Sequence, residues 1–335
     1  MNPIYKKYKT VFWFFGAIVV VGLLPQIVTA LIPAQASYWQ HIFIIVLLYV
    51  ILATGLNMLT GVTGLLSIGH AAFYGLGAYT SALLGLHFQL PFVVTFLMAG
   101  VVAGVMGLLL SLPSLKLRDT YLTIVTIGFG QIVYTILNEW RELTKGPMGL
   151  SHIPAPSFFG YTLDTRIKYF YLLLVMTALF VLVAYQLERS LVGRAMKSVR
   201  DDQLAAEVVG VNTKYYKMFS FTLSAVFAGC AGSLYAHYLG YISPDTFGAN
   251  FSTSMLMMVI IGGLGSIPGS IIGAVVVALL PEILRQFSQW QLVIYGVLLI
   301  IFMIFLPKGL VQLFKDLLNK IFGTKNKKSL TKEDR

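Results

Sequence analysis

Long apolar segments alternate with short polar stretches over most of the chain. No Asp, Glu, Lys or Arg occurs from Thr10 to Leu115, a run that could supply several membrane spans of about 20 residues each. The segment at 251–264 is too short for a full span. The pattern predicts an all-α polytopic membrane protein with about ten transmembrane helices, one of them short or broken. The expected apolar segments lie near residues 11–32, 41–60, 64–86, 91–112, 119–138, 168–187, 218–240, 251–264, 267–284 and 290–306.

Composition and charge placement agree with this class. Of all residues, 57% are hydrophobic and only 11% are charged, whereas a soluble domain is nearer a quarter charged. The lack of polar–apolar alternation excludes a β-barrel. Four basic clusters, at 6–9, 116–118 and 189–217 and from Lys308 onward, hold 19 of the 24 Lys and Arg residues. Because basic residues concentrate in cytosolic loops, both termini are expected in the cytosol, and the net charge of +11 reflects orientation rather than nucleic-acid binding.

The chain is expected to divide into two parts. Residues 1–311 form a transmembrane domain that includes the charged cytosolic loop at 189–217. Residues 312–335 begin with an amphipathic pattern and end in a Lys-rich stretch, which predicts a surface helix followed by a disordered basic tail. The apolar run at 11–32 is longer than the core of a signal peptide, so we expect an uncleaved first span.

A cluster of polar side chains lies at membrane depth within the second and third apolar segments. Such groups face the interior of a bundle or a water-filled path, so we interpret them as candidates for a translocation path. The alternative is that they join helices by hydrogen bonds. The solitary histidine has no partner at metal-ligand spacing, which argues against a metal site. The residues are Asn57, Thr60, Thr63, Ser67 and His70.

A second interruption, IIGGLGSIPGSIIG, lies at 260–273. Its glycines and Pro268 break any straight helix. Broken backbone inside a membrane must be buried in protein or line a cavity, and paired interruptions in the two halves of a transporter indicate its substrate path. We therefore add Gly263, Gly265 and Ser266 to the candidate path. The alternative is an ordinary turn between two spans on the cytosolic side.

Catalytic and cofactor motifs are missing from the sequence. There is no GxxxxGK[ST] motif, so nucleotide hydrolysis through a P-loop is not expected. No Ser/His/Asp or Cys/His constellation is visible either. The chain is therefore predicted not to be an enzyme and to bind no cofactor of its own.

The charged loop at 189–217 has the pattern of a short folded helix. Asp201 and Asp202 are good N-cap residues, and Gly210 is placed to end the helix. A chain built for lipid does not need a folded, charged cytosolic element. The loop therefore suggests that something outside the membrane acts on it, as in a driven transporter.

Large and small side chains lie at different positions of this predicted helix. Leu204 and Val208 share one face at i, i+4 spacing, while Ala205 and Ala206 leave little bulk, so that a groove on another protein could close around the helix. The alternative is an interfacial helix held by its own bundle. Three preceding cations could meet acidic groups on a partner or lipid phosphates: Arg194, Lys197 and Arg200.

The outer loop between Asn138 and Lys168 is rich in Gly and Pro. This density indicates a structured, turn-rich segment. The loop could dock a partner or gate the outer mouth, or it could simply connect two spans.

Several stretches, taken together, resemble one family. They occur in order and cover most of the chain from Gly55 to Pro281. The chain resembles the membrane permease subunits of ABC importers for branched-chain amino acids, of the LivM type in LivH/LivM pairs. The stretches are GLNMLTGVTGLLSIGHAAFYGLGAYTSALL (55–84), LRDTYLTIVTIGFGQIV (117–133), KGPMGLSHIP (145–154), GRAMKSVRDDQLAAEVVGVNTKYYKMFSFTLSAVFAGCAGSLYA (193–236) and VIIGGLGSIPGSIIGA (259–274).

The resemblance implies a permease subunit in the bacterial cytoplasmic membrane. It would pair with a homologous permease, bind two ATPase subunits that use ATP and Mg, and receive substrate from an extracytoplasmic binding protein. The charged loop would hold a coupling helix seated in a groove of the ATPase, with the family's Ala-Ala-x-x-x-Gly spacing on Ala205, Ala206 and Gly210. The candidate coupling residues are Gly193, Arg194, Arg200, Leu204, Ala205, Ala206, Glu207 and Gly210.

Two positions depart from the family's pattern. Leu204 stands where the family has a Glu before the two alanines, although Glu207 follows them. In the outer loop, the residues from Thr144 to Met148 read TKGPM where the family often has Thr-Gly-Gly. These departures bear on the polar contacts to the ATPase and on how the binding protein docks.

Other functions remain open from the sequence. A permease for urea or short amides would have very similar segments. An ion-coupled secondary transporter should carry titratable groups within its spans. Between Lys217 and Pro307, however, the only Asp, Glu, Lys or Arg residues are Asp245, Glu282 and Arg285. A membrane scaffold would not need the coupling loop.

Overall fold

The computed structural model describes residues 3–114, 119–158 and 161–287, with the separate positions 290, 293–294, 296–298, 300 and 309–311. The predicted tail at 312–335, most of the predicted segment at 290–306 and the basic pair at 116–118 lie outside the described residues. Each expected segment from 11–32 to 267–284 contains a helix. The helices are α1 (Pro3–Leu31), α2 (Ala36–Asn57), α3 (His70–Phe88), α4 (Phe92–Ser114), α5 (Asp119–Glu139), α6 (Arg141–Thr144), α7 (Arg166–Arg189), α8 (Leu191–Asp201), α9 (Gln203–Val208), α10 (Thr213–Leu239), α11 (Ala249–Gly262) and α12 (Ile267–Ile283).

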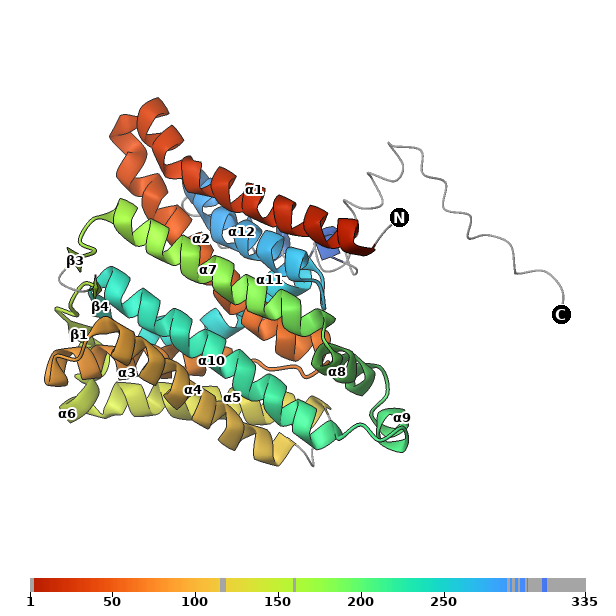
Figure 1. The fold of residues 1–335 in the computed structure, drawn as a ribbon. Helices are drawn as coiled ribbons and strands as arrows, with labels where there is room; N and C mark the ends of the chain where they lie inside the picture. The colour runs from red at the N-terminus through yellow and green to blue at the C-terminus, as the bar shows by residue number, and fades with distance from the viewer. Residues whose placement is uncertain are drawn as a thin grey trace.

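Length and hydropathy confirm a mostly helical, polytopic membrane protein. Within the described residues, five helical segments are long and apolar enough to cross a membrane, and α12 and the second half of α1 are apolar but shorter. The long helices lie side by side along one direction, with α8 and α9 at one end of the bundle (Figure 1). The five segments are Pro33–Val62, Phe92–Pro113, Tyr121–Glu139, Arg166–Arg189 and Thr213–Leu239.

Helix α10 forms the centre of the bundle, where α3 and α4 approach it closely. A Cβ at Gly77 of α3 would overlap the carbonyl of Gly229 on α10, and a Cβ at Gly229 would lie 2.6 Å from the carbonyl oxygen of Ala99 on α4. Lipid tails are as apolar as Leu, so membrane helices associate through such close packing of small residues. The glycines of this region therefore set how near the three helices can come.

Helices α11 and α12 form an antiparallel hairpin. Gly262 and Gly269 face each other so closely that a Cβ on either would meet the other's backbone. The 14 residues of α11 rise about 21 Å, less than the roughly 30 Å of a hydrocarbon core, as the short predicted segment indicated. The turn between the helices lies against Gly309, where a Cβ would overlap the backbone of Gly263.

The outer loop is structured, which confirms that part of the prediction, and it adds short strands to an otherwise helical fold. Strand β1 (Leu150–Ser151) pairs antiparallel with β4 (Tyr241–Ile242), and β2 (Ser157–Phe158) pairs with β3 (Tyr161–Thr162). Short 3-10 turns also occur in the described chain, at Pro33–Gln35, Gly146–Met148, Pro244–Phe247 and Leu284–Phe287. All four strands lie at the end of the bundle opposite α8 and α9 (Figure 1).

Candidate functional site

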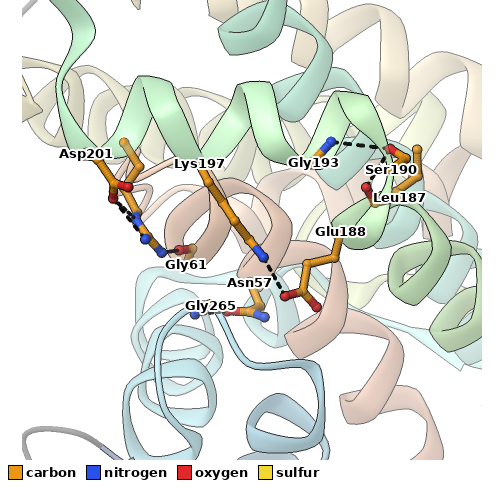
Figure 2. Close-up of polar contacts among 10 residues, drawn as sticks. Asn57, Gly61, Leu187, Glu188, Ser190, Gly193, Lys197, Asp201 and Gly265 are labelled. Atoms are coloured by element: carbon orange, nitrogen blue, oxygen red, sulfur yellow. Dashed lines mark hydrogen bonds and ion pairs between the residues drawn. The ribbon is translucent and has the colours of Figure 1, made fainter. Parts of the chain in front are cut away.

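The two predicted interruptions meet in space. Helix α2 continues into a π-helical turn at Met58–Val62, and the amide of Gly265 in the α11–α12 turn donates to Asn57 Oδ1 at 2.8 Å. Gly61 lies against the same turn, because a Cβ there would overlap the Gly265 amide nitrogen. Figure 2 shows Asn57 and Gly265 joined in this way beside α8. The interrupted backbone is thus packed in protein, as its location requires.

The third predicted segment begins later than expected. The sequence predicted an apolar helix over 64–86, but α3 starts at His70, and residues 63–69 are not helical. Gly64 has a φ of +84°, a left-handed conformation that ends a helix. The amide of Ile68 then donates to Thr126 Oγ1 on α5 at 3.1 Å. A tertiary contact to α5 therefore replaces the helical hydrogen bonds that the apolar pattern predicted.

The five polar residues predicted for the path are all buried in the chain. Thr60 Oγ1 donates to the Leu65 carbonyl, and Thr63 Oγ1 donates to the Met58 carbonyl, each at 3.1 Å. These bonds match the alternative interpretation, in which the side chains hold backbone together. Contact between these threonines and a substrate stays a prediction.

Three members of the same set have unused hydrogen-bonding atoms. His70 Nε2 lies 3.1 Å from Ser224 Oγ on α10, and Ser224 donates to the Gly55 carbonyl at 2.7 Å. Within the described residues, His70 Nδ1, Ser67 Oγ and Asn57 Nδ2 have no hydrogen-bond partner. Buried polar atoms of this kind usually bind water or another ligand. These three atoms therefore remain candidates for contact with water or substrate along the predicted translocation path.

The second interruption is a tight turn between α11 and α12. Gly263 and Gly265 have φ values of +114° and +75°, which favour glycine. Ser266 caps α12, since its Oγ accepts from the Gly269 amide at 3.3 Å. The structure therefore matches the alternative of an ordinary turn, and it places this turn beside the end of α2.

Helix α8 was not predicted, because the sequence analysis placed only one short helix in the charged loop. Ser190 caps it by accepting from the Gly193 amide at 3.3 Å. Gly193 has no room for a side chain, because a Cβ would overlap the carbonyls at the end of α7. The apolar residues Val192, Met196 and Val199 follow the i, i+4, i+7 spacing of an amphipathic helix, and this signal could have identified α8.

The predicted short helix is present as α9, and its caps are as expected at Asp202 and Gly210. Asp202 Oδ1 accepts from the Ala205 amide at 3.0 Å, and Gly210 has a φ of +86°. Asp201 is not a cap. It is the last residue of α8, and its Oδ1 accepts from Arg200 Nη2 at 2.9 Å.

The exposed face of α9 is apolar. The relative exposure of Leu204 is 74% and that of Val208 is 87%, so the residue that departs from the family's pattern lies on the outer surface. Ala205 is also exposed, but Ala206 is buried in the chain. The two alanines therefore point in different directions, and a groove on another protein could meet Ala205 but not Ala206.

The inner side of α9 is fastened to α10 by polar side chains. Lys217 Nζ donates to Gln203 Oε1 at 2.6 Å, and Thr213 donates to Glu207. The hydrogen bonds from Thr213 and then from Gln203 lower the pKa of Glu207 below its ordinary value. Glu207 therefore stays ionised at neutral pH, and α9 is held to its own bundle while its apolar face stays free.

Two of the three cations before α9 are engaged within the chain. Lys197 pairs with Glu188 of α7 at 2.8 Å. Arg200 Nη1 donates to the Gly61 carbonyl at 3.0 Å, while Arg194 is exposed. Figure 2 shows the Lys197 pair and the contact at Gly61 on the same side of α8. The proposed contact with acidic groups of a partner is therefore geometrically open to Arg194 first.

A depression of about 640 Å³ opens at the opposite end of the bundle, where α2 and α7 begin and α10 ends. His41 Nδ1 lies 2.7 Å from Tyr238 Oη, and Arg166 donates to the Ser37 carbonyl at 3.4 Å. The sequence analysis named none of these residues as candidates, because they come together only in the fold. The lining residues are Ser37, Tyr38, His41, Ala155, Leu163, Asp164, Thr165, Arg166, Tyr169, His237, Tyr238 and Leu239.

Comparison with known proteins places this architecture in one family. Residues 38–306 match the family described as branched-chain amino acid transport system / permease component. The chain is 37% identical over 292 residues to the high-affinity branched-chain amino acid transport system permease protein LivM of Escherichia coli strain K12. This match covers 80% of this chain and 68% of that protein.

Two further relatives are more distant. LivH of the same organism is 24% identical over 288 residues, or 78% of this chain and 90% of that protein. The fructose import permease protein FrcC of Rhizobium meliloti is 32% identical over 190 residues, or 53% of this chain and 52% of that protein. No solved structure matches the chain. The chain belongs to the family of branched-chain amino acid transport system permease components.

Proposed function

We propose that this permease component is the membrane-spanning subunit of an ATP-driven importer for branched-chain amino acids. It pairs with a homologous permease, binds two ATPase subunits in the cytosol and receives substrate from an extracytoplasmic binding protein. ATP and Mg are used by the ATPases, and this chain binds no cofactor. Similarity to both LivM and LivH supports the paired arrangement, because both are permease proteins of high-affinity branched-chain amino acid transport systems.

The observation that carries this proposal is the exposed apolar face of α9. Exposure of Leu204 and Val208 to water is energetically unfavourable for the helix. Exposed apolar surface of this kind marks protein contacts. The helix is fastened to the bundle on its other side through Gln203 and Glu207. A partner that binds the apolar face of α9 could therefore move the helix, and the polar contacts on the other side would transmit that movement to the bundle. The ATPase is that partner in our proposal.

The topology in this proposal has ten transmembrane helices and both termini in the bacterial cytosol. Residues 1–311 form the permease domain, and residues 312–335 form an amphipathic and then disordered basic tail. Two observations support it. The turn at Gly263 contacts Gly309, so the end of the described chain lies beside the α11–α12 turn. That turn also lies beside α8, whose loop is rich in basic residues, as is typical of a cytosolic side.

Transport then follows an alternating-access cycle. Closure of the ATPases moves α8 and α9, and the two permeases open in turn to each side of the membrane. Substrate passes between the permeases, near the interrupted backbone at 57–70 and 263–266. In the described spans the path side offers polar groups with unused hydrogen-bonding atoms, such as His70 and Ser67, rather than a buried ion pair. Weak binding along the path suits an importer whose binding protein selects the substrate.

The proposal is tested by transport in proteoliposomes. The chain is purified with the proteins encoded beside it, and uptake of leucine and urea is measured with and without internal ATP. We expect leucine uptake that requires ATP and the ATPase subunits. ATP-dependent uptake of urea without leucine would move the chain to the urea and short-amide importers. Uptake that is the same without ATP would refute the ABC mechanism and favour an ion-coupled transporter.

A further inference from the structure

The cytosolic end of α2 has a polar cap that comes from another helix. The last carbonyl groups of a helix lack partners within it, and this end carries partial negative charge. Helix α2 has no basic residue in its last turn. Arg200 of α8 supplies the cation, because its Nη1 donates to the Gly61 carbonyl at 3.0 Å across 139 residues of sequence. A charge-assisted bond of this kind is stronger than a neutral one.

The guanidinium of Arg200 is held in a fixed orientation. Its Nε and Nη2 donate to Asp201 Oδ1 at 3.1 and 2.9 Å, which leaves Nη1 directed at Gly61. Two glycines with positive φ make room for the side chain. A Cβ at Gly64 would lie 2.7 Å from Arg200 Cγ, and a Cβ at Gly265 would lie 3.1 Å from Nη1.

Three elements therefore meet at one point: the end of α2, the α11–α12 turn and the last turn of α8. Asn57 accepts from Gly265 at 2.8 Å, and Gly61 packs directly against Gly265. The next residue after the Arg200–Asp201 pair is Asp202, which caps α9. A displacement of α9 can thus reach the end of α2 and the α11–α12 turn through the Arg200 side chain.

We propose that Arg200 is the positioning residue that transmits movement of α9 to the two interrupted segments, by holding the Gly61 carbonyl beside the Asn57–Gly265 bond. This inference rests on the proposed function, since it assigns how the ATPase stroke reaches the translocation path. The contacts of α9 with α10 hold the helix in place. The Arg200 contact couples it to α2 and to the α11–α12 hairpin.

The first test reads the junction in the purified chain, without transport. Arg200→Gln removes the cation, and hydrogen–deuterium exchange is followed in peptides covering 57–66 and 262–266. We expect faster exchange in both peptides, and no change in peptides of α3 or α4. Lys214→Gln is the matched control, because it removes one exposed cation from the same cytosolic cluster. Unchanged exchange in Arg200→Gln overturns the proposal, whatever the chain transports.

The second test compares uptake with ATP use in the reconstituted transporter. We expect leucine uptake per ATP hydrolysed to fall about tenfold in assemblies that carry Arg200→Gln, within the range of measured couplings between sites. Arg200→Lys keeps a cation but cannot bind Gly61 and Asp201 with one planar fork, so it should recover part of the ratio. A merely structural residue would lower uptake, hydrolysis and thermal stability together, and that result would overturn the proposal.

The two tests also separate the proposal from the proposed function. If the wild-type assembly shows no ATP-dependent uptake of leucine, the proposed function fails, while hydrogen exchange still decides whether Arg200 holds the junction. If Arg200→Gln does not accumulate in the membrane, Arg200→Lys is measured alone. A wild-type exchange pattern and a wild-type uptake ratio in that variant would then overturn the proposal. They would show that a guanidinium bound to both Gly61 and Asp201 is not needed.

Discussion

Gly77 and Gly229 show how single atoms decide the packing of this bundle. Each lies where two helix backbones touch, so that an added Cβ on Gly77 would meet the Gly229 carbonyl. Backbone atoms cannot move aside as a flexible side chain can. The cost of a methyl group at this position is therefore set by the separation of α3 and α10 rather than by hydrophobicity.

We expect Gly77→Ala to destabilise the protein by about 3 kcal/mol, the upper part of the usual range for overpacking. Thermal unfolding in detergent should show a lower transition temperature and less protein in the membrane. Gly128→Ala on α5 is the matched control, because a Cβ at Gly128 has no atom within 4 Å. Equal stability of the two variants would mean that α3 and α10 are further apart than described.

At the scale of elements, α8 and α9 form one unit with two faces. The inner face buries apolar side chains of α8 and is bonded to α7, α2 and α10 through Lys197, Arg200 and Gln203. The outer face carries Leu204 and Val208 in solvent. A partner that contacts α9 at Leu204, where the resemblance implies a Glu, would therefore meet an apolar surface.

We expect Leu204→Asp and Val208→Asp each to reduce co-purification of the ATPase about tenfold, as for a moderate interface residue. Insertion of the chain into the membrane should not change, because both side chains are exposed. Leu191→Asp is the control, since Leu191 on α8 has the same 74% exposure as Leu204. An equal loss of ATPase in all three variants would argue against a specific role of α9.

Ala206→Glu is a less selective test of the same contact. Ala206 is only 3% exposed, so a buried carboxylate would disturb the packing of α9 on its own bundle. Loss of ATPase binding in that variant would therefore report misfolding of the loop as much as a lost contact.

At the scale of the whole molecule, the two ends of the bundle have different characters. One end holds α8, α9 and the α11–α12 turn, and the other holds the strand pairs and the turn-rich loop (Figure 1). The basic clusters of the described chain lie mainly at the first end, as the positive-inside rule requires of a cytosolic face. The molecule is thus polarised, and our proposal assigns the first end to the ATPases and the other end to the binding protein.

Cysteine labelling in oriented membrane vesicles tests this polarity. Cys230 is the single cysteine and is buried, so a Cys230→Ala chain is a suitable background. We expect a membrane-impermeant thiol reagent to label Leu204→Cys only from the cytosolic side. Met148→Cys, at a position that is 82% exposed, should react only from the outside. Labelling of both variants from one side would contradict the topology.

Much of this architecture could be predicted from the sequence. Nine of the predicted apolar segments contain a helix of the described chain, although four of these helices start five to eight residues from the predicted position. Asp202 and Gly210 marked the ends of α9. The Gly and Pro content predicted the structured outer loop. These features depend on local composition, on the length needed to cross a bilayer and on backbone geometry near caps and glycines. Residues that are close together in the sequence determine all three.

Other features depended on contacts between distant segments. The apolar pattern did not reveal that α3 starts at His70, because the break at 63–69 is stabilised by Thr126 on α5. The burial of Ala206 and the exposure of Ala205 depend on which side of α9 faces the bundle. The outer depression at Arg166 likewise forms only when α2, α7 and α10 converge.

By itself, the sequence determined that this is a polytopic helical protein with a folded cytosolic loop, because hydrophobicity and capping act over a few neighbouring residues. Only the tertiary structure decided that the two interruptions touch each other and that Arg200 joins them to that loop. The Gly61 carbonyl and the Arg200 guanidinium are 139 residues apart, and nothing in either local sequence selects the other. Their contact exists because the packing of α8 brings a cation to a helix end that lacks one.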